Sequence, residues 1–186
     1  MTKVIGDSEM FMWDGGCVFV GSTNAVVPVH AHHAIQVCFG RDGDLRLRPS
    51  DDAPWLSAPL FVVASHQPHA FDATDVSLGF VMFVEPETRE GRVLTELCGA
   101  NGFGVIDPAT IKEASEELFH CFLTRAGDAA AADSARRVLG QVTHGVEPLV
   151  VSDERILKAI AFINANLGQQ LTLDQVAAEV FLSPGR

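Results

Sequence analysis

The sequence predicts an α+β protein in which an antiparallel β-barrel comes first and helices follow. Three observations support this prediction. Up to residue 86, short apolar runs alternate with turn residues, which is typical of a closed barrel or jelly roll and not of βαβ units. From residue 87 to 143, apolar residues recur at helical spacing in two segments. From residue 152 to 186, two further short helices carry clear start and stop signals.

The expected strands of the barrel, residues 1–86, are short. Two apolar runs, 10–13 and 17–20, flank Asp14-Gly15-Gly16, which is a hairpin signal. Residues 30–39 alternate along one expected strand, with Ile35, Val37 and Phe39 on one face. Residues 49–59 are rich in Pro, Asp and Ser and predict a loop. The remaining expected strands are residues 45–48, 60–64, 69–71 and 77–84.

The region 87–143 predicts helices. Residues 89–97 are a first, weaker candidate, and a Gly-rich stretch follows them. Asp107-Pro108 then supplies an N-cap and a first-turn proline. The apolar stripe of the next helix runs to about residue 125, and Gly127 separates it from a helix expected at 129–142, so an antiparallel hairpin is predicted. That stripe includes Ile111, Leu118 and Phe122.

The last segment, 152–186, follows an expected linker at 144–151. Ser152 is the expected N-cap of its first helix, and acidic residues occupy the first turn, where the helix dipole favours them. An apolar stripe follows, made of Ile156, Ile160, Ile163 and Leu167. Thr172 and Gln175 have the spacing of a capping box for a second short helix. Ser183-Pro184 then predicts the start of a third helix.

This pattern of helix, tight turn and new helix is that of a helix-turn-helix unit. The residues ILKAIAFINANLGQQLTLDQVAAEVFLSPGR resemble the start of the DNA-binding domain of AraC-type transcription regulators. In that family an I-x-x-A-x-x-F/Y-I-x-x-N helix precedes an L-T/S-L-x-x-V/L-A helix, and the recognition helix opens at Ser-Pro. The resemblance covers about thirty-five residues. It implies a DNA-binding region that begins with Thr172, Gln175, Ser183 and Arg186.

The same resemblance implies that the chain is truncated before the recognition helix is complete. We therefore expect DNA binding by the full-length protein only. Phe181 departs from turns of this kind, which often carry Gly. The alternative interpretation of the segment is an ordinary helical hairpin that closes a globular domain.

The histidine-rich stretch carries the remaining chemistry. His30-Ala31-His32, then Gln36 and Gly43, follow the spacing of the first cupin motif, His-x-His-x3-Glu-x6-Gly, with Gln in place of Glu. The second cupin motif is represented by His69, with Ala73 in the place of its closing Asn. Alternation would direct the side chains of the first motif toward the lumen of a barrel.

Two interpretations of these residues stay open. His30, His32, Gln36 and His69 could hold a divalent metal with open coordination positions. Gln is a weaker ligand than Glu and compensates no charge. In the other interpretation no metal is required, and a polar effector pocket is formed by His30, His32, Gln36, Cys38 and His69. His33 is expected to pack or to face solvent on the opposite side, and His66 to lie in a loop.

Composition narrows the function. The chain has 13 Lys and Arg against 24 Asp and Glu, a formal net charge of −11, which argues against a nucleic-acid surface in these 186 residues. It contains no apolar run of membrane-spanning length and does not open as a signal peptide, so we expect a cytoplasmic protein that does not bind membranes. The cysteines lack C-x-x-C spacing and predict reduced thiols. They are Cys17, Cys38, Cys98 and Cys121.

Two function classes compete. The first is the ligand-sensing and dimerising part of a bacterial AraC-type regulator, and we expect no enzyme activity from it. The resemblance implies a homodimer. The candidate interface consists of Ile111, Leu118 and Phe122. The second is a small metal-dependent cupin enzyme with helical additions. The segment 152–186 favours the regulator, because an enzyme has no use for it. The sequence does not identify the effector or the operator.

Overall fold

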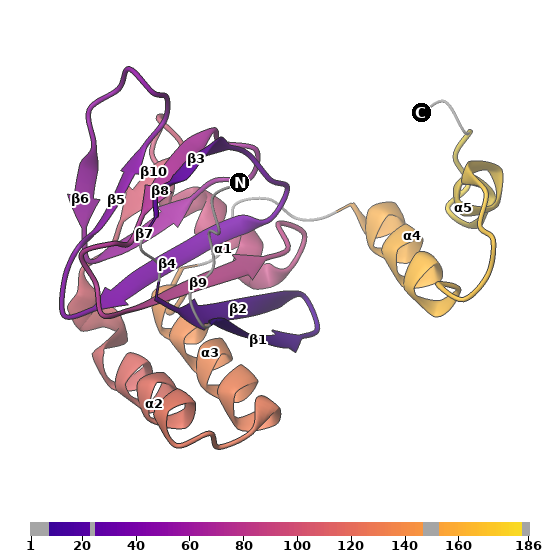
Figure 1. Cartoon of the computed structure of the whole chain (residues 1–186). Coiled ribbons are helices and arrows are strands. Elements are labelled where there is room, and N and C mark those ends of the chain that lie inside the picture. Colours follow the sequence, from indigo (N-terminus) through magenta and orange to yellow (C-terminus); the bar gives the residue numbers. More distant parts are fainter. Residues whose placement is uncertain (1–7, 23–24, 147–152, 184–186) are drawn as a thin grey trace. The chain divides into compact units, whose positions relative to one another are not determined.

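The computed structural model describes residues 8–22, 25–146 and 153–183 (Figure 1). It forms two compact units that meet between Leu149 and Val150 in the sequence, and each unit is described by itself. The first contains ten strands, a 3₁₀-helix and three α-helices, and the second contains two α-helices among its described residues. No helix in the described part of the chain has the length and apolar character needed to cross a membrane.

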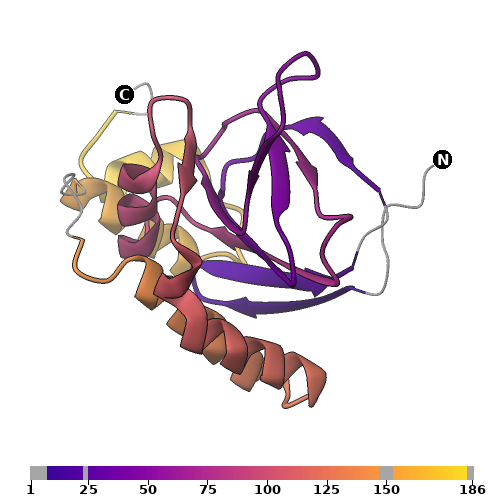
Figure 2. The same cartoon turned by 90° about the vertical axis from the view of Figure 1, so that its left-hand side faces the viewer.

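The strands of the first unit form two antiparallel sheets, which confirms the predicted fold class. The six-stranded sheet has the order β1 (Ser8–Trp13), β2 (Gly16–Gly21), β9 (Leu78–Val84), β4 (Ile35–Arg41), β7 (Leu60–Val63), β10 (Phe103–Val105). The four-stranded sheet has the order β3 (Val27–His30), β8 (His69–Asp72), β5 (Leu45–Arg48), β6 (Leu56–Ala58). The two sheets are the walls of a jelly-roll barrel (Figure 2).

The first hairpin shows how local sequence determines the sheet. β1 and β2 pair in register from Ser8 with Gly21 to Trp13 with Gly16, so that the turn is Asp14-Gly15 as predicted. Gly15 has a φ of +90°, which favours glycine. A Cβ at Gly16 would lie 2.6 Å from the carbonyl oxygen of Phe83 on β9, so only glycine lets the two strands approach this closely.

The expected strand at residues 30–39 is wrong as a single element. β3 ends at His30 in one sheet and β4 begins at Ile35 in the other, so residues 31–34 cross between the walls of the barrel. The alternation that suggested one strand holds within β4, where Ile35, Val37 and Phe39 share one core cluster and Cys38 belongs to another. A two-residue period does not show where a chain passes from one sheet to another. The sequence pattern therefore suggested one strand where the structure has two.

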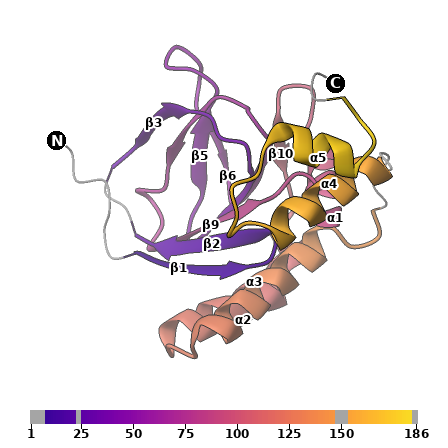
Figure 3. The same ribbon diagram turned by 90° about the vertical axis from the view of Figure 1, so that its right-hand side faces the viewer.

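Helices cover the outer face of the six-stranded sheet. The 3₁₀-helix η1 (Pro108–Ile111), with Asp107 as its N-cap, leads into α2 (Lys112–Leu123), and α3 (Asp128–Val142) returns beside it (Figure 3). α1 (Arg89–Leu97) precedes them and has the predicted bounds. Apolar residues from both layers share one core, which includes Val37, Phe80, Leu118, Val138 and Leu139.

A second apolar core fills the space between the two sheets. Leu45, Leu47 and Phe71 of the four-stranded sheet share it with Phe61 and Val63 of the six-stranded sheet. β4 therefore lies between two cores, and its first five side chains are all buried. An antiparallel strand buried on both faces carries apolar or uncharged residues on both, and Ile-Gln-Val-Cys-Phe meets this requirement.

Two predictions about the first unit need correction. The barrel does not end at residue 86, because β10, which follows α1, pairs with β7. The predicted loop 49–59 contains β6. Both missed strands are three-residue edge strands, too short to show a period. Ile111 and Leu118, proposed for dimerisation, are 3% and 0% exposed within this chain, whereas Phe122 is partly buried. Their apolar stripe covers the barrel.

The second unit contains α4 (Glu154–Ala165) and α5 (Leu173–Glu179). The N-cap of α4 is Asp153, whose carboxylate accepts from the amide of Arg155, and not the predicted Ser152, which lies outside the described residues with Pro184 and Arg186. The predicted capping box of Thr172 and Gln175 is present at the start of α5. Apolar side chains remain exposed on this unit, among them Ile156, Leu157, Ile163, Leu167 and Leu173.

The end of α5 explains the residue that departs from the usual turn. Phe181 has a φ of +56° and is 91% exposed. Its amide donates to the carbonyl of Ala178, and the amide of Leu182 donates to the carbonyl of Ala177 over 2.8 Å. These two bonds are those of a Schellman motif, in which glycine usually takes the left-handed position. Phe181 therefore makes the turn despite its side chain. Ser183 follows and is exposed.

Candidate functional site

Three imidazoles from separate segments meet inside the barrel. His30 ends β3, His32 lies in the crossing between the sheets, and His69 begins β8. The ring centroids of His30 and His69 are 4.5 Å apart, and those of His32 and His69 are 5.2 Å apart. One ligand atom from each of the three residues lies within 4.8 Å of the others. The sequence prediction that these residues share a site is consistent with this geometry.

Backbone carbonyls orient all three rings. Nδ1 of His30 lies 2.9 Å from the carbonyl oxygen of Pro28, Nδ1 of His32 lies 2.7 Å from that of Ala34, and Nδ1 of His69 lies 2.9 Å from that of Gln67. Carbonyl oxygen can only accept, so each Nδ1 carries the proton. In the neutral imidazole, Nε2 is then left with a free lone pair.

Gln36 adds a fourth polar atom from the opposite sheet. Its Oε1 lies 3.2 Å from Nε2 of His32 and 3.3 Å from Nε2 of His69. The amide nitrogen of Gln36 donates to Sγ of Cys38 over 3.5 Å, which directs Oε1 toward the imidazoles. With the protons on Nδ1, these contacts bring together atoms that all accept. A cation, the donor groups of a ligand, or a turned amide of Gln36 that directs its NH2 group at the imidazoles would satisfy these acceptors.

Burial keeps two groups of the site, His69 and Cys38, uncharged. Desolvation, the largest cause, and the neighbouring His30 and His32 together lower the pKa of His69 to about 4, against the raising effect of its bond to the Gln67 carbonyl. His69 is therefore an uncharged imidazole at pH 7 and can act as a ligand. Desolvation also raises the pKa of Cys38 to about 12, so Cys38 remains a thiol. Cys38 accepts a hydrogen bond from Gln36.

The donor set fits a divalent cation. Ligand atoms about 2.1 Å from a tetrahedral metal are about 3.4 Å apart, close to the two contacts of Gln36 Oε1. A metal-bound imidazole usually donates its other ring N–H to a carbonyl or carboxylate, and each Nδ1 here does so to a backbone carbonyl. His30, His32, His69 and Gln36 carry no negative charge, so a bound cation would keep its full charge and would attract an anionic or oxygen-bearing ligand.

A cavity of about 280 Å³ adjoins the site. Of the residues predicted to bind an effector, His30 and Gln36 line it, whereas His32, Cys38 and His69 are not among its lining residues. The other walls are mainly apolar and include Phe19, Val27, Phe71, Val81 and Phe83. A mostly apolar cavity with a few converging polar groups is typical of a small-molecule site.

These apolar walls are the part of the site that was not assigned from the sequence. Val18 and Val20 belong to the core under the helices, so Phe19 between them faces the barrel. On β9, Phe80, Met82 and Val84 face the helices, and Val81 and Phe83 face the cavity. The alternation was visible, but both faces of β2 and β9 are apolar, so their sequences do not show which face lines a pocket.

Comparison with known proteins gives similar structures at low identity. No family model matches the chain, and no curated protein matches it. The AraC-like transcriptional activator CuxR matches over 92% of this chain and 68% of its own, with 15% identity and a TM-score of 0.47. Protein NMB1881 from Neisseria meningitidis matches over 45% of this chain and 89% of its own, with 15% identity and a TM-score of 0.38.

An RmlC-like cupin from Desulfovibrio desulfuricans matches over 41% of this chain and 81% of its own, with 17% identity and a TM-score of 0.33. Similarities of this size do not by themselves assign a function. The solved structures similar to this chain thus include an AraC-like activator and RmlC-like cupins, the two groups that its sequence resembles.

Proposed function

We propose that this chain contains the effector-sensing, cupin-type domain of an AraC-type transcription regulator. The observation that carries the proposal is the cavity beside His30 and Gln36, in a chain that also contains the α4–α5 unit. The proposal places effector sensing in the barrel. It places the helices of a helix-turn-helix unit in the second unit.

The lining residues define the class of effector. Phe19, Phe71 and Phe83 favour an apolar body of modest size, since the cavity is about 280 Å³. The polar end of the effector would meet His30 and Gln36. A divalent cation at the imidazoles would act as a Lewis acid toward an oxygen of that end. We infer a small molecule with an apolar tail and a carboxylate or carbonyl group.

The residues of the site divide their roles. His32 and His69 direct their Nε2 lone pairs toward Gln36, and their Nδ1–H groups donate to the backbone carbonyls of Ala34 and Gln67. Gln36 spans the two sheets, because it lies on β4 and contacts His69 on β8. A ligand that changes the position of Gln36 would therefore change how the walls of the barrel meet.

The second unit supports the regulatory part of the proposal. Its capping box and its Schellman turn at Phe181 hold two helix ends in defined geometry. Its exposed apolar side chains, such as Ile156 and Leu167, need a partner surface. A complete helix-turn-helix domain would provide one. Homodimerisation belongs to the same proposal, with an interface that does not involve the buried Ile111 and Leu118.

A thermal-shift titration with small carboxylates tests the sensing function. Hexanoate and benzoate should raise the melting temperature of the chain, because a ligand that binds only the folded state stabilises it. His30→Ala should remove the shift without unfolding the protein, whereas His144→Ala, an exposed position outside the site, should leave it unchanged. Equal shifts in the wild type and in His30→Ala would argue against this pocket.

One observation favours a second candidate, a metal-dependent cupin enzyme. Ligand atoms of three imidazoles lie within 4.8 Å of one another, and the amide oxygen of Gln36 contacts two of these imidazoles, a set that could hold a metal with open positions. The two functions differ in what happens to a bound ligand. Mass spectrometry of a carboxylate incubated with the metal-loaded protein should recover it unchanged for a regulator and converted to product for an enzyme.

A further inference from the structure

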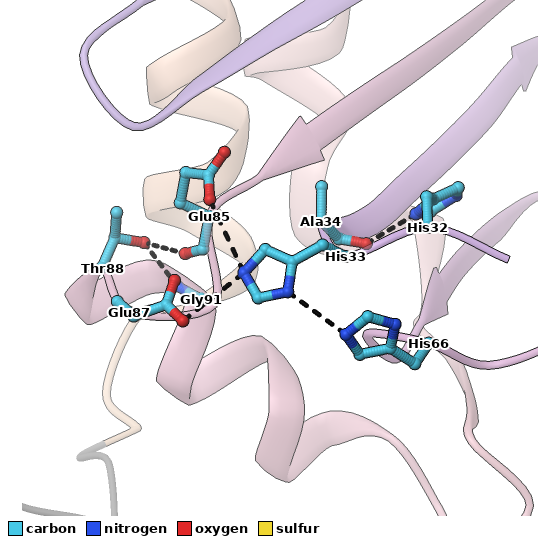
Figure 4. A network of polar contacts seen from close by, with 8 residues as sticks. All are labelled: His32, His33, Ala34, His66, Glu85, Glu87, Thr88 and Gly91. Carbon is cyan, nitrogen blue, oxygen red and sulfur yellow. Dashed lines mark hydrogen bonds and ion pairs between the residues drawn. The ribbon is translucent and has the colours of Figure 1, made fainter. Parts of the chain in front are cut away.

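A second histidine cluster lies on the outside of the first unit. His33, one residue after the inner ligand His32, points away from it (Figure 4). Nε2 of His33 lies 3.5 Å from Oε1 of Glu87 and 4.0 Å from Oε2 of Glu85. The ligand atoms of these three residues all lie within 4.8 Å of one another. Nδ1 of His33 lies 3.3 Å from Nε2 of His66.

Three separate segments contribute these side chains. His33 belongs to the crossing between β3 and β4, His66 to the loop between β7 and β8, and the two glutamates to the turn between β9 and α1. That turn is firmly built. The amide and the hydroxyl of Thr88 both donate to the carbonyl of Glu85, and a Cβ at Gly91 would lie 2.1 Å from the same oxygen. The backbone therefore presents both carboxylates next to His33.

The charges at this cluster favour a cation. The two glutamates carry a formal charge of −2. When Nδ1 of His33 donates to His66, its Nε2 presents a lone pair to two carboxylates, and all three groups are acceptors. A divalent cation would satisfy the three acceptors and the charge together. The inner site differs, because its ligands carry no charge.

We propose that His33, Glu85 and Glu87 form a second, outer site for a divalent transition-metal ion such as zinc, with His66 as the residue that orients His33. One imidazole and two carboxylates are a usual ligand set for this ion, and a tetrahedral zinc site spaces its ligand atoms about 3.4 Å apart. The distances of 3.5 and 4.0 Å need only small movements of exposed side chains. The fourth position is left for water or for another ligand.

The outer site would couple two parts of the fold. His33 of the outer site belongs to the same crossing, residues 31–34, as His32 of the inner site. Nδ1 of His32 donates to the carbonyl of Ala34, within the same crossing. The carboxylates of the outer site precede α1. The crossing also holds His32, a residue of the inner site. An ion at the outer site would therefore attach this crossing to the turn that begins α1. Because such coupling is reciprocal, occupation of either site should change the affinity of the other.

Calorimetric titration of the full, metal-stripped chain with zinc tests the proposal. The wild type should bind about two equivalents. Glu87→Gln and His33→Ala should each lose one equivalent, and His69→Ala should lose the other. Glu96→Gln, an exposed glutamate of α1 outside the cluster, is the matched control and should bind as the wild type does. His66→Ala should keep the stoichiometry and weaken the outer site about tenfold or more.

The outcomes separate the two sites. Zinc binding that is identical in the wild type, Glu87→Gln and His33→Ala overturns the outer site. If the wild type binds one equivalent of zinc and only His69→Ala removes it, the outer site is overturned and the inner site stands. One equivalent that only Glu87→Gln and His33→Ala remove supports the outer site and counts against metal in the barrel. Far-UV circular dichroism checks folding, and Gln replaces an exposed Glu at similar volume.

Discussion

Oε1 of Gln36 lies 3.3 Å from Nε2 of His69, and the two residues belong to opposite walls of the barrel, on β4 and β8. Both side chains are buried. This contact therefore brings polar atoms of the two sheets together beside the apolar core that the sheets share. The side chain at position 36 determines whether this place in the barrel favours a cation or the polar group of a ligand. A substitution of Gln36 therefore tests the site directly.

Gln36→Glu should convert the site into a stronger metal site. A carboxylate adds the negative charge that the present ligands lack, and metal affinity should rise about tenfold or more. Without metal, the variant should be less stable than the wild type, because it buries a charge. Added zinc should consequently raise the melting temperature of Gln36→Glu more than that of the wild type. Equal shifts in both proteins would contradict metal coordination at this position.

Val27→Phe should block the cavity. Val27 lines the cavity and is partly buried beside the core between the sheets. A larger side chain there should weaken benzoate binding about tenfold or more, because a ligand has to displace it or bind elsewhere. Val29→Phe, on the same strand but exposed and outside the cavity, is the control. Isothermal titration measures the benzoate affinity of both variants. Equal affinities for Val27→Phe and Val29→Phe would show that benzoate binds outside this cavity.

Leu118→Ala should destabilise the chain without changing its association state. Leu118 is 0% exposed, and large-to-small changes in a core cost about 2–5 kcal/mol. Leu123→Ala, on the same helix but 61% exposed, should change the free energy of unfolding by less than about 0.5 kcal/mol. Urea denaturation measures both values. A change in sedimentation for Leu118→Ala with unchanged stability would restore it as an interface residue.

Asp72 should make stability depend on acid pH. Burial raises its pKa, but hydrogen bonds from the amide and hydroxyl of Thr74 and the Arg46 guanidinium 2.6 Å away outweigh burial and lower it. A lowered pKa gives stability that is fully present above the unfolded-state pKa of about 3.9 and is lost as pH falls through the folded-state value.

Asp72→Asn tests this expectation. At pH 7 the variant should be less stable by about 1–3 kcal/mol, because Arg46 and Thr74 lose a charged acceptor. The difference in free energy of unfolding between wild type and variant should become smaller as pH falls below about 4, where the wild-type carboxylate takes up a proton. Urea titrations at pH 7, 5 and 3 measure this difference. An equal difference at pH 3 and pH 7 would show that Asp72 is not held ionised by these partners.

Phe181→Gly should stabilise the end of α5. The left-handed conformation costs a non-glycine residue about 1–2 kcal/mol, and the exposed ring of Phe181 offers little packing in return. The amide of Leu182, which donates to Ala177, should exchange its hydrogen several-fold more slowly in the variant. Phe181→Ala serves as the control, because it removes the ring and keeps the strain. Faster exchange in Phe181→Gly would mean that the ring itself holds the turn.

The sequence was most informative where a local signal determines structure. Asp14-Gly15 predicted the first turn, Asp107-Pro108 the start of η1, and Thr172 with Gln175 the start of α5, since caps and turns depend on neighbouring residues alone. The two-residue period also separated Val37 from Cys38 correctly. Each of these features needs no knowledge of what lies across the fold.

Features that depend on distant segments could not be predicted this way. The break between His30 and Ile35 follows from the closure of the barrel, and β10 exists because its residues return to β7. Ile111 and Leu118 form an apolar stripe, which indicates burial but not the partner. For the site, the motif spacing identified four polar residues, whereas the apolar walls and the outer cluster of His33, Glu85 and Glu87 required the three-dimensional arrangement.

The double burial of β4 has a consequence for how this chain could transmit a signal. Gln36 faces the cavity and Val37 faces the core shared with α2 and α3, so the ligand side and the helix side are separated by one peptide bond. Any displacement of the backbone at Gln36 moves the surface on which Leu118 and Val138 pack. Communication between a ligand in the cavity and the helical layer would then need neither a hinge nor a long relay of side chains, because β4 contributes residues to both.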